Sequence, residues 1–338
     1  MVRPRLSMNV CRLLWAVVAC LGMLAESHGE EAPPFPTDPN AWINSGPLSV
    51  DALKGKGIVL WFFEEDDTSS AARWTPMLEA SNKFAKRQLP VVFIAVNSGS
   101  PRAKVDAYLK QLPAKVTWPV LVDTSRDFEK ACGLFQEVND KNVSVIRYIK
   151  PDGEIQTSVT EVIEDVAEKA LEGAKWKVEP NTIPDSLKPM WLAVEIGNYK
   201  GIAANLKKST SSPKPDIKDA STKLMEIVQK EIDDQMAKIK EAQEATNPYR
   251  AFELLNELTE HFNGFELPKD VATLKKDLPK DAKVKAGQAA VKVMEMARKQ
   301  MGANGLKPKN KAALEKLIAE FPDTNLAKQA KALIDYAP

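Results

Sequence analysis

The most constraining feature of the sequence is a fully apolar run that passes directly into an acidic junction. Ile58–Phe63 contains only aliphatic and aromatic side chains, and Glu64–Asp67 supplies four consecutive acids before a helix-favouring stretch opens at Thr68. A short apolar run bounded by polar residues is typical of a strand buried on both faces. Acids and hydroxyls suit the start of a helix, where backbone N–H groups lack partners. We therefore predict a buried strand that feeds directly into a helix N-terminus.

Short β-rich runs alternate with helical stretches over residues 43–176. A hairpin turn is expected at Asp152-Gly153, because that dipeptide favours tight turns between strands. The alternation predicts a mixed α/β sheet flanked by helices. The predicted strands are Ile58–Phe63, Val91–Asn97, Val120–Val122, Val143–Ile149 and Glu154–Val159, and the predicted helices are Thr68–Arg87, Arg102–Gln111 and a helix from Ser125 that stops at Gly133.

The second half of the chain has almost no β signal. A proline-containing stretch, residues 177–189, is expected to be a linker, and residues 190–338 are expected to be all helical. Long helices are predicted at Asp216–Thr246 and Lys280–Met301. A pattern typical of helical hairpins recurs after 59 residues, pairing Leu255, Leu258, Phe262, Leu267, Lys269 and Leu274 with Leu314, Leu317, Phe321, Leu326, Lys328 and Leu333.

That recurrence allows two interpretations of the helical region. Stacked hairpins would resemble tetratricopeptide-type repeats and form a peptide-binding solenoid. Alternatively, a small helical domain simply packs on the sheet domain. So few copies leave both interpretations open.

The N-terminus has the features of an export signal. Basic residues precede an apolar stretch, Leu13–Ala25, and small residues follow at the expected cleavage position, which gives a signal peptide over residues 1–29. The stretch is too short to span a bilayer comfortably, so no transmembrane segment is expected in the mature chain. A lipid anchor on Cys20 is the less favoured alternative. Residues 30–42 hold several prolines and are expected to be an extended spacer.

Cysteine, histidine and charge exclude several function classes. Cleavage after Gly29 would leave Cys132 as the only cysteine, so no internal disulfide, dithiol centre or cysteine-based zinc site is expected. His28 and His261 are the only histidines, which excludes histidine triads and multi-histidine metal sites in the mature chain. The 47 basic and 46 acidic residues nearly balance, so nucleic acid is not an expected partner.

Three segments together resemble the thioredoxin-like superfamily, specifically its exported redoxin branch of envelope thiol-disulfide oxidoreductases and alkyl hydroperoxide reductase relatives. The strand Ile58–Phe63 precedes a helix containing Trp74-Thr75-Pro76, where the family often has a helix-kinking proline. Trp118–Asp123 resembles the family's strand before the next helix, and Val145–Ile155 resembles its closing hairpin. The resemblance implies a thioredoxin-like fold over about a third of the chain.

The same resemblance shows what is missing. The family's Cys-x-x-Cys would fall on Thr68-Ser69-Ser70-Ala71, and its cis-proline would fall near Ser144; neither is present. A reactive thiol works as a thiolate stabilised by a helix N-terminus and nearby positive charge, whereas four carboxylates precede this helix. We therefore expect no catalytic residues and no cofactor, and dithiol exchange is not expected.

The acidic junction and Cys132 each allow two different roles. Glu64, Glu65, Asp66 and Asp67 could bind a hard cation such as Ca²⁺, although capping of the helix by Asp67 or Thr68 is favoured. Cys132 could be a peroxidase nucleophile, but its place at a helix C-terminus favours a buried structural role.

Aromatic and histidine side chains are expected to be structural. Trp61 and Trp118 are expected to pack, and Trp74 is expected to be the exposed tryptophan of the three. His261 is expected to be a structural or surface residue whose positive charge would complement a helix dipole.

The first functional hypothesis is an exported, redox-inactive thioredoxin-fold protein that acts as a binding or assembly module in the periplasm or cell envelope, with an unidentified protein or peptide partner. The alternatives are a divergent oxidoreductase or peroxidase using Cys132, and a metal-dependent activity at Glu64–Asp67.

Overall fold

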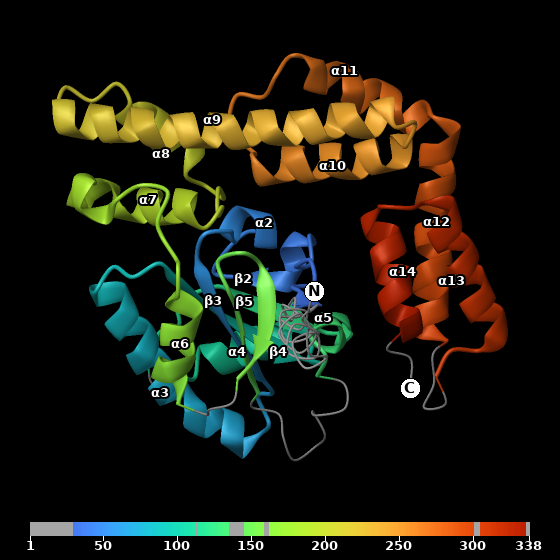
Figure 1. The fold of residues 1–338 in the computed structure, drawn as a ribbon, viewed down its shortest axis with the longest axis horizontal. Coiled ribbons are helices and arrows are strands. Elements are labelled where there is room, and N and C mark those ends of the chain that lie inside the picture. The colour runs from blue at the N-terminus through green and yellow to red at the C-terminus, as the bar shows by residue number, and fades with distance from the viewer. Residues whose placement is uncertain (1–29, 113, 135–144, 159–161, 301–304, 336–338) are drawn as a thin grey trace, which may run out of the picture. The chain divides into compact units, whose positions relative to one another are not determined.

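The computed structural model describes residues 30–112, 114–134, 145–158, 162–300 and 305–335. The predicted export segment, Cys20 and Ser144 lie outside the described residues. From Glu31 onward the chain forms one unit with continuous internal contacts. This unit contains both the α/β sheet domain and the all-helical region expected from the sequence (Figure 1).

The sheet has seven strands in the order β1-β7-β6-β3-β4-β5-β2. The adjacent strands β3, β4 and β5 are parallel, while β6 pairs antiparallel with β3 and β2 pairs antiparallel with β5. The sheet is therefore mixed, as predicted. Its strands are β1 (Glu30–Glu31), β2 (Trp42–Ile43), β3 (Gly57–Phe63), β4 (Val91–Ser98), β5 (Val120–Asp123), β6 (Ile146–Ile149) and β7 (Glu154–Thr157).

Strand β3 is buried along its whole length because helices cover both faces of the sheet. Its alternate side chains enter two different cores. Val59, Trp61 and Phe63 pack with α3 (Thr68–Lys86), α4 (Arg102–Leu109) and α6 (Ile163–Leu171). The intervening side chains pack with α2 (Val50–Leu53) and α5 (Asp127–Ala131). This two-sided burial explains the uninterrupted apolar run in the sequence.

The helical region contains two hydrophobic cores. The first is formed by helices α7 to α11, in which α9 lies alongside α10 (Figure 1). The second is formed by α12, α13 and α14 together with Tyr249 from α10. The helices are α7 (Lys188–Glu195), α8 (Ala203–Ser209), α9 (Pro215–Glu244), α10 (Pro248–His261), α11 (Asp270–Asp277), α12 (Ala282–Lys299), α13 (Pro308–Glu320) and α14 (Asn325–Asp335). The two predicted long helices correspond closely to α9 and α12.

Both proline-containing stretches are packed rather than loose. In the expected spacer, Phe35 is buried in the core on one face of the sheet. Pro39–Ala41 forms a single 3₁₀ turn with proline at its first position, so the expectation of a wholly extended segment was wrong there. In the expected linker, Val178, Ile183 and Leu187 are buried in the first helical core. Hydrophobic side chains between the prolines account for this packing.

The recurring hairpin pattern is matched only in part. Phe262 and Phe321 are buried, and each caps the C-terminal end of its helix, α10 or α13. Leu326 lies in α14, whereas its counterpart Leu267 lies in the loop before α11. Helix α13 packs chiefly against α14, but α10 packs chiefly against α9. The tetratricopeptide-like interpretation therefore stays a prediction.

None of the helices within the described ranges is long and apolar enough to cross a membrane.

Candidate functional site

The junction after β3 is organised around the N-terminus of α3. Asp67 is the N-cap, and its carboxylate accepts a 2.6 Å hydrogen bond from the Ser70 backbone N–H. The Ser70 hydroxyl is fully buried and accepts a 3.2 Å bond from the Glu64 N–H. The segment expected to replace the family's cysteine pair thus contributes a hydroxyl that closes the turn. Of the two caps expected from the sequence, Asp67 or Thr68, the structure has Asp67.

Glu65 is the most tightly held of the four acids. Its carboxylate accepts hydrogen bonds from Asn97 (2.8 Å) and the Ser100 hydroxyl, and lies 2.7 Å from the Lys104 ammonium. Burial alone would raise the pKa of this carboxyl. The bonds from Lys104, Ser100 and Asn97 outweigh burial and lower the pKa of Glu65 to about 2. Glu65 is therefore ionised at neutral pH, and its carboxylate joins the ends of β3 and β4.

The remaining acids point to separate partners. Glu64 forms an ion pair with Arg126, and Asp66 forms one with Lys104. Within the described part of the chain, no group of three or more His, Cys, Asp or Glu side chains is placed to hold a metal ion. Glu65 and Asp66 share the Lys104 ammonium, whereas Glu64 and Asp67 have other partners, so each acid has a structural contact; the cation site considered from the sequence stays a prediction.

Aromatic side chains fill the space under this junction. The rings of Trp61 and Trp74 meet edge to face at 4.5 Å, and Trp118 stacks against Trp74 at 6.3 Å. Trp74 is 1% exposed, so the prediction that it would be the exposed tryptophan was wrong. Its position one turn into α3 faces the sheet, where it packs on β3. These rings form a core rather than a ligand groove.

Cys132 lies in the core on the opposite face of the sheet from Trp61 and Trp74. It is buried at the C-terminal end of α5, followed by Gly133 with φ +74°, as the sequence predicted. Its side chain belongs to the core on one face of the sheet, whereas α3 covers the other face. The helix dipole at this end disfavours a thiolate.

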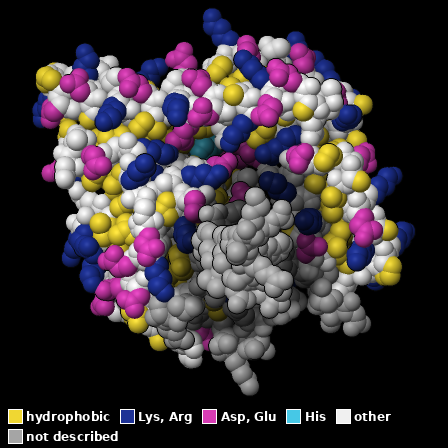
Figure 2. All heavy atoms as spheres, in the orientation of Figure 1, with side chains coloured by type: hydrophobic (Ala, Val, Ile, Leu, Met, Phe, Trp, Pro, Cys, Tyr) yellow, Lys and Arg dark blue, Asp and Glu magenta, His cyan; other side chains and the backbone are white. Residues whose placement is uncertain are grey.

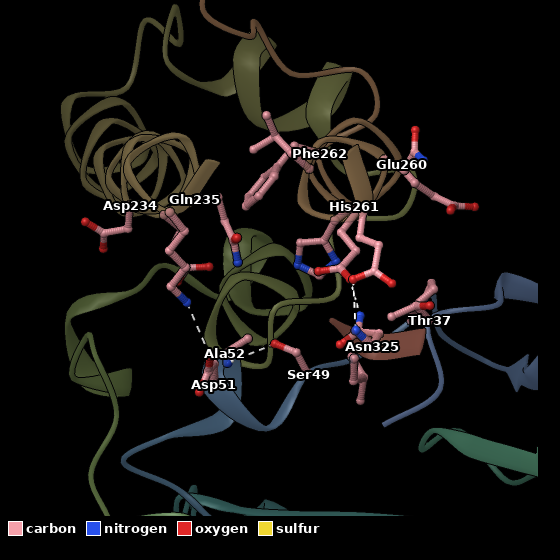
Figure 3. Close-up of a pocket in the computed structure, with 18 of the residues that line it drawn as sticks. Thr37, Ser49, Asp51, Ala52, Asp234, Gln235, Glu260, His261, Phe262 and Asn325 are labelled. Carbon is pink, nitrogen blue, oxygen red and sulfur yellow. Dashed lines mark hydrogen bonds and ion pairs between the residues drawn. The ribbon is translucent and has the colours of Figure 1, made fainter. Parts of the chain in front are cut away.

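A cavity of about 560 Å³ lies between the sheet domain and the helices (Figure 3). The segment Pro47–Ala52 and helices α9, α10, α12 and α14 contribute to its wall. Figure 2 shows acidic and basic side chains gathered around the hollow on this face. The sequence analysis missed the cavity because its wall comes from segments far apart in the chain. The spacing of Glu253, Glu257 and Glu260, which places three acids on one face of a helix, was the available signal.

Two of these acids fasten α14 to α10. Glu253 accepts hydrogen bonds from the backbone N–H groups of Asn325 (2.8 Å) and Leu326 (3.1 Å), which open α14. Glu257 accepts a bond from the Asn325 side-chain amide. Burial raises the pKa of Glu257, and the nearby Arg250 only partly offsets that effect. Two partly buried, hydrogen-bonded carboxylates thus form part of the cavity wall.

His261 points from α10 into the cavity toward the segment that holds Ser49 and Ala52 (Figure 3). Its ring packs edge to face on Tyr199 at 5.0 Å. Burial lowers the pKa of His261 to about 4, although Glu231 and a hydrogen bond to the Pro47 backbone favour its charged form. With this low pKa the imidazole is mostly neutral at pH 7, so it adds little positive charge at the C-terminal end of α10, and its packing on Tyr199 is a structural role.

Comparison with known proteins identifies the sheet domain. Residues 28–158 match the model of the AhpC/TSA family. The domain is thioredoxin-like. Its parallel β3-β4-β5 strands, antiparallel β6-β7 hairpin and flanking helices agree with that match.

Solved structures give further likenesses of low identity. A putative protein disulfide isomerase from Bacteroides thetaiotaomicron is 18% identical, with 43% of this chain and 85% of that chain covered and a TM-score of 0.34. A thioredoxin family thiol:disulfide interchange protein from Chlorobium tepidum TLS is 20% identical, with 44% and 99% covered and a TM-score of 0.33. A secreted Mycobacterium tuberculosis disulfide oxidoreductase is 13% identical, with 37% and 87% covered and a TM-score of 0.29. No curated protein sequence gives a significant match.

Proposed function

We propose that this chain is an exported binding or assembly module of the cell envelope, built on a thioredoxin-like domain that performs no thiol chemistry. The observation that carries the proposal is the state of the α3 N-terminus. Thr68-Ser69-Ser70-Ala71 stands where the family's cysteine pair would be, and Ser70 and Asp67 are used to close the turn. Export is proposed from the signal-like segment at residues 1–29.

The electrostatics of the junction support the loss of thiol chemistry. A thiolate at position 68 would directly follow the capping carboxylate of Asp67 and come three residues after Glu65, whose low pKa keeps it ionised. Nearby anions raise a thiol pKa and so suppress the nucleophile. The cations at this corner, Lys104 and Arg126, are already paired with acids. Restoring a cysteine alone would therefore not restore a reactive thiolate.

The cavity supports a binding role. Its volume of about 560 Å³ is in the range of sites that hold a small molecule or several side chains of a peptide. Its wall combines charged groups with apolar surface from Leu258, Phe262 and Met294. Both the sheet domain and the helical region contribute, so a ligand there would need both parts of the chain.

The absence of thiol chemistry is tested with the purified mature protein. We expect no dithiothreitol-dependent insulin reduction and no peroxide consumption, with an active thioredoxin and an active peroxidase as positive controls. Peroxide turnover that disappears in Cys132→Ser would overturn the proposal in favour of the peroxidase alternative.

The binding role is tested with charge-reversal variants at the cavity. Asp234 and Glu260 line it and are exposed, so Asp234→Lys and Glu260→Lys should fold normally. The matched control is Glu266→Lys, an exposed acid in the loop before α11 that does not line the cavity. We expect a defined envelope protein or peptide to co-purify with wild type and the control and to be lost with the cavity variants. Identical recovery with all four proteins would remove the cavity as the binding site.

A further inference from the structure

Helix α12 presents an apolar stripe that no described part of the chain covers. The helix buries Val284, Gly287, Met294 and Ala297 against the neighbouring helices. On a different face it exposes Ala282, Ala286, Ala289, Val293 and Met296. Val293 is 36% exposed and Met296 is 53% exposed, and both are among the few large apolar side chains exposed in the described residues. Figure 1 shows α12 beside α13 and α14.

The spacing of the stripe matches the seam of a two-helix contact. The five positions follow one another at intervals of four, three, four and three residues. This alternation keeps apolar side chains on one side of a helix in register with a second helix. At 1.5 Å per residue the stripe is about 20 Å long, enough for roughly two heptads of a partner helix.

A column of lysines flanks the same stripe. Lys285, Lys292 and Lys299 are seven residues apart and exposed; Lys285 and Lys292 immediately precede Ala286 and Val293 of the stripe, and Lys299 continues the column just beyond Met296. None of the ion pairs found among the described residues involves these three side chains. In a coiled-coil contact such flanking positions meet the flank of the partner helix and set its charge preference. The column therefore favours acids on the partner.

A second copy of α12 is a poor match for this surface. In a parallel pair Lys285 and Lys292 would face the positions of Ala290 and Ala297 on the other copy, which offer no acid, and Ala297 is itself buried against the neighbouring helices. In an antiparallel pair the two lysine columns would face each other and repel. A helix from a different protein, with acids at its flanking positions, would supply the missing acids and avoid the repulsion between lysines.

The helix is held firmly enough to act as a platform. A Cβ at Gly287 would lie 2.2 Å from the Tyr249 ring, which shows how closely α12 approaches α10. Near its C-terminal end, Arg298 forms a 2.6 Å ion pair with Asp127 of the sheet domain. A docked helix would therefore meet a surface already fixed in the fold, at little ordering cost.

We propose that the exposed face of α12, defined by Ala282, Ala286, Ala289, Val293, Met296 and the three flanking lysines, docks one amphipathic helix of a partner protein with an apolar four-three seam and acidic flanks. The proposal rests on the proposed binding role, because a docked helix is one form of it. It concerns a surface separate from the cavity.

The test uses synthetic helical peptides of three heptads with leucine at the seam. One peptide carries glutamate at both flanks, and the matched peptide carries lysine there. We expect the acidic peptide to bind the full mature chain at least about tenfold more tightly than the basic one in fluorescence anisotropy, and the preference to shrink as salt is raised. Equal binding of the two peptides, or no binding of either, would overturn the proposal.

Substitutions at exposed residues test whether the peptide contacts α12, and they should leave the fold intact. We expect Val293→Glu with Met296→Glu to weaken acidic-peptide binding by about tenfold or more. The triple variant Lys285→Glu, Lys292→Glu and Lys299→Glu should reverse the preference toward the basic peptide. Lys311→Glu, on exposed α13 surface, is the matched control and should bind like wild type. Unchanged binding in the stripe variant would refute the assignment.

Two further results separate the possible outcomes. A dimer in sedimentation equilibrium that Met296→Glu dissociates would overturn the proposal in favour of self-association. Thiol assays and cavity variants do not involve α12, so peroxide turnover would defeat the proposed function while leaving the peptide result standing. Conversely, failure of the peptides would leave the absence of thiol chemistry unaffected.

Discussion

The Lys56 ammonium lies 3.0 Å from the Glu195 carboxylate, and neither side chain is exposed to solvent. Lys56 immediately precedes β3, and Glu195 ends α7, so this ion pair joins the sheet domain to the first helix of the helical region. Glu195 also accepts hydrogen bonds from the backbone N–H groups of Lys177 (2.9 Å) and Val178 (2.6 Å). Burial lowers the pKa of Lys56, and the charge of Glu195 partly restores it. Fully buried pairs of this kind are costly to break from one side.

We expect Lys56→Met to lower the free energy of unfolding by about 3–5 kcal/mol, because it leaves the Glu195 carboxylate buried with only two backbone donors. Adding Glu195→Gln should recover part of the loss, since the neutral amide oxygen can still accept from Val178. Lys54→Met is the control: its ion pair with Asp51 is exposed, and its loss should cost less than about 1 kcal/mol. Urea unfolding gives the free energy of unfolding of each variant. A Lys56→Met protein as stable as the control would contradict the role of the pair.

Loss of the α3 N-cap should be measurable at the altered junction. Asp67→Ala removes the 2.6 Å bond to the Ser70 N–H and should destabilise the protein by about 1 kcal/mol. Asp66→Ala, at a side chain 78% exposed, should change stability by less than about 0.5 kcal/mol. Thermal unfolding with and without calcium separates capping from the cation alternative. Calcium that stabilises wild type but neither variant would favour a metal site instead.

The sequence predicted the central fold because burial leaves a direct pattern there. Ile58–Phe63 is apolar throughout since both faces of β3 are covered, and the acids after it mark the helix N-terminus that Asp67 caps. Trp74 was misjudged because spacing within one helix does not tell which side faces the sheet. The direction of α3 over β3 is fixed by tertiary packing.

Features formed by residues that are far apart in the sequence could not be predicted. Lysine is rarely buried, so nothing local indicates that Lys56 is enclosed until Glu195 is placed beside it. The cavity has the same origin, because Asp51, Glu257 and Asn325 line one space only after the helices pack. His261 was treated as a helix-end residue, and its burial against Tyr199 decided its charge.

The contact between α10 and α12 gives a packing prediction. A Cβ at Gly287 would lie within 2.2–2.5 Å of three atoms of the Tyr249 ring, and that ring is buried in the second helical core. Gly287→Ala should therefore destabilise the protein by about 1–3 kcal/mol, although alanine favours helix formation more than glycine. Gln288→Ala, exposed on the same helix, should be neutral or slightly stabilising. If Gly287→Ala proved more stable in urea unfolding, the close approach of the two helices would be disproved.

Titration of His261 gives a dependence of stability on pH whose sign is fixed by its environment. The folded pKa of about 4 lies below the ordinary value of 6.5, because burial disfavours the imidazolium. The contribution of the neutral ring to stability is therefore fully present above pH 6.5 and is lost as pH falls from 6.5 to 4, by up to about 3 kcal/mol. Burial raises the pKa values of Glu257 and of Asp123, the latter to about 7, so both act in the opposite direction. The unfolding free energy of wild type minus that of His261→Gln isolates the histidine, since glutamine can still donate to the Pro47 backbone. This difference should decrease from pH 7 to pH 4, and a constant difference would show that the imidazole is accessible and protonates normally.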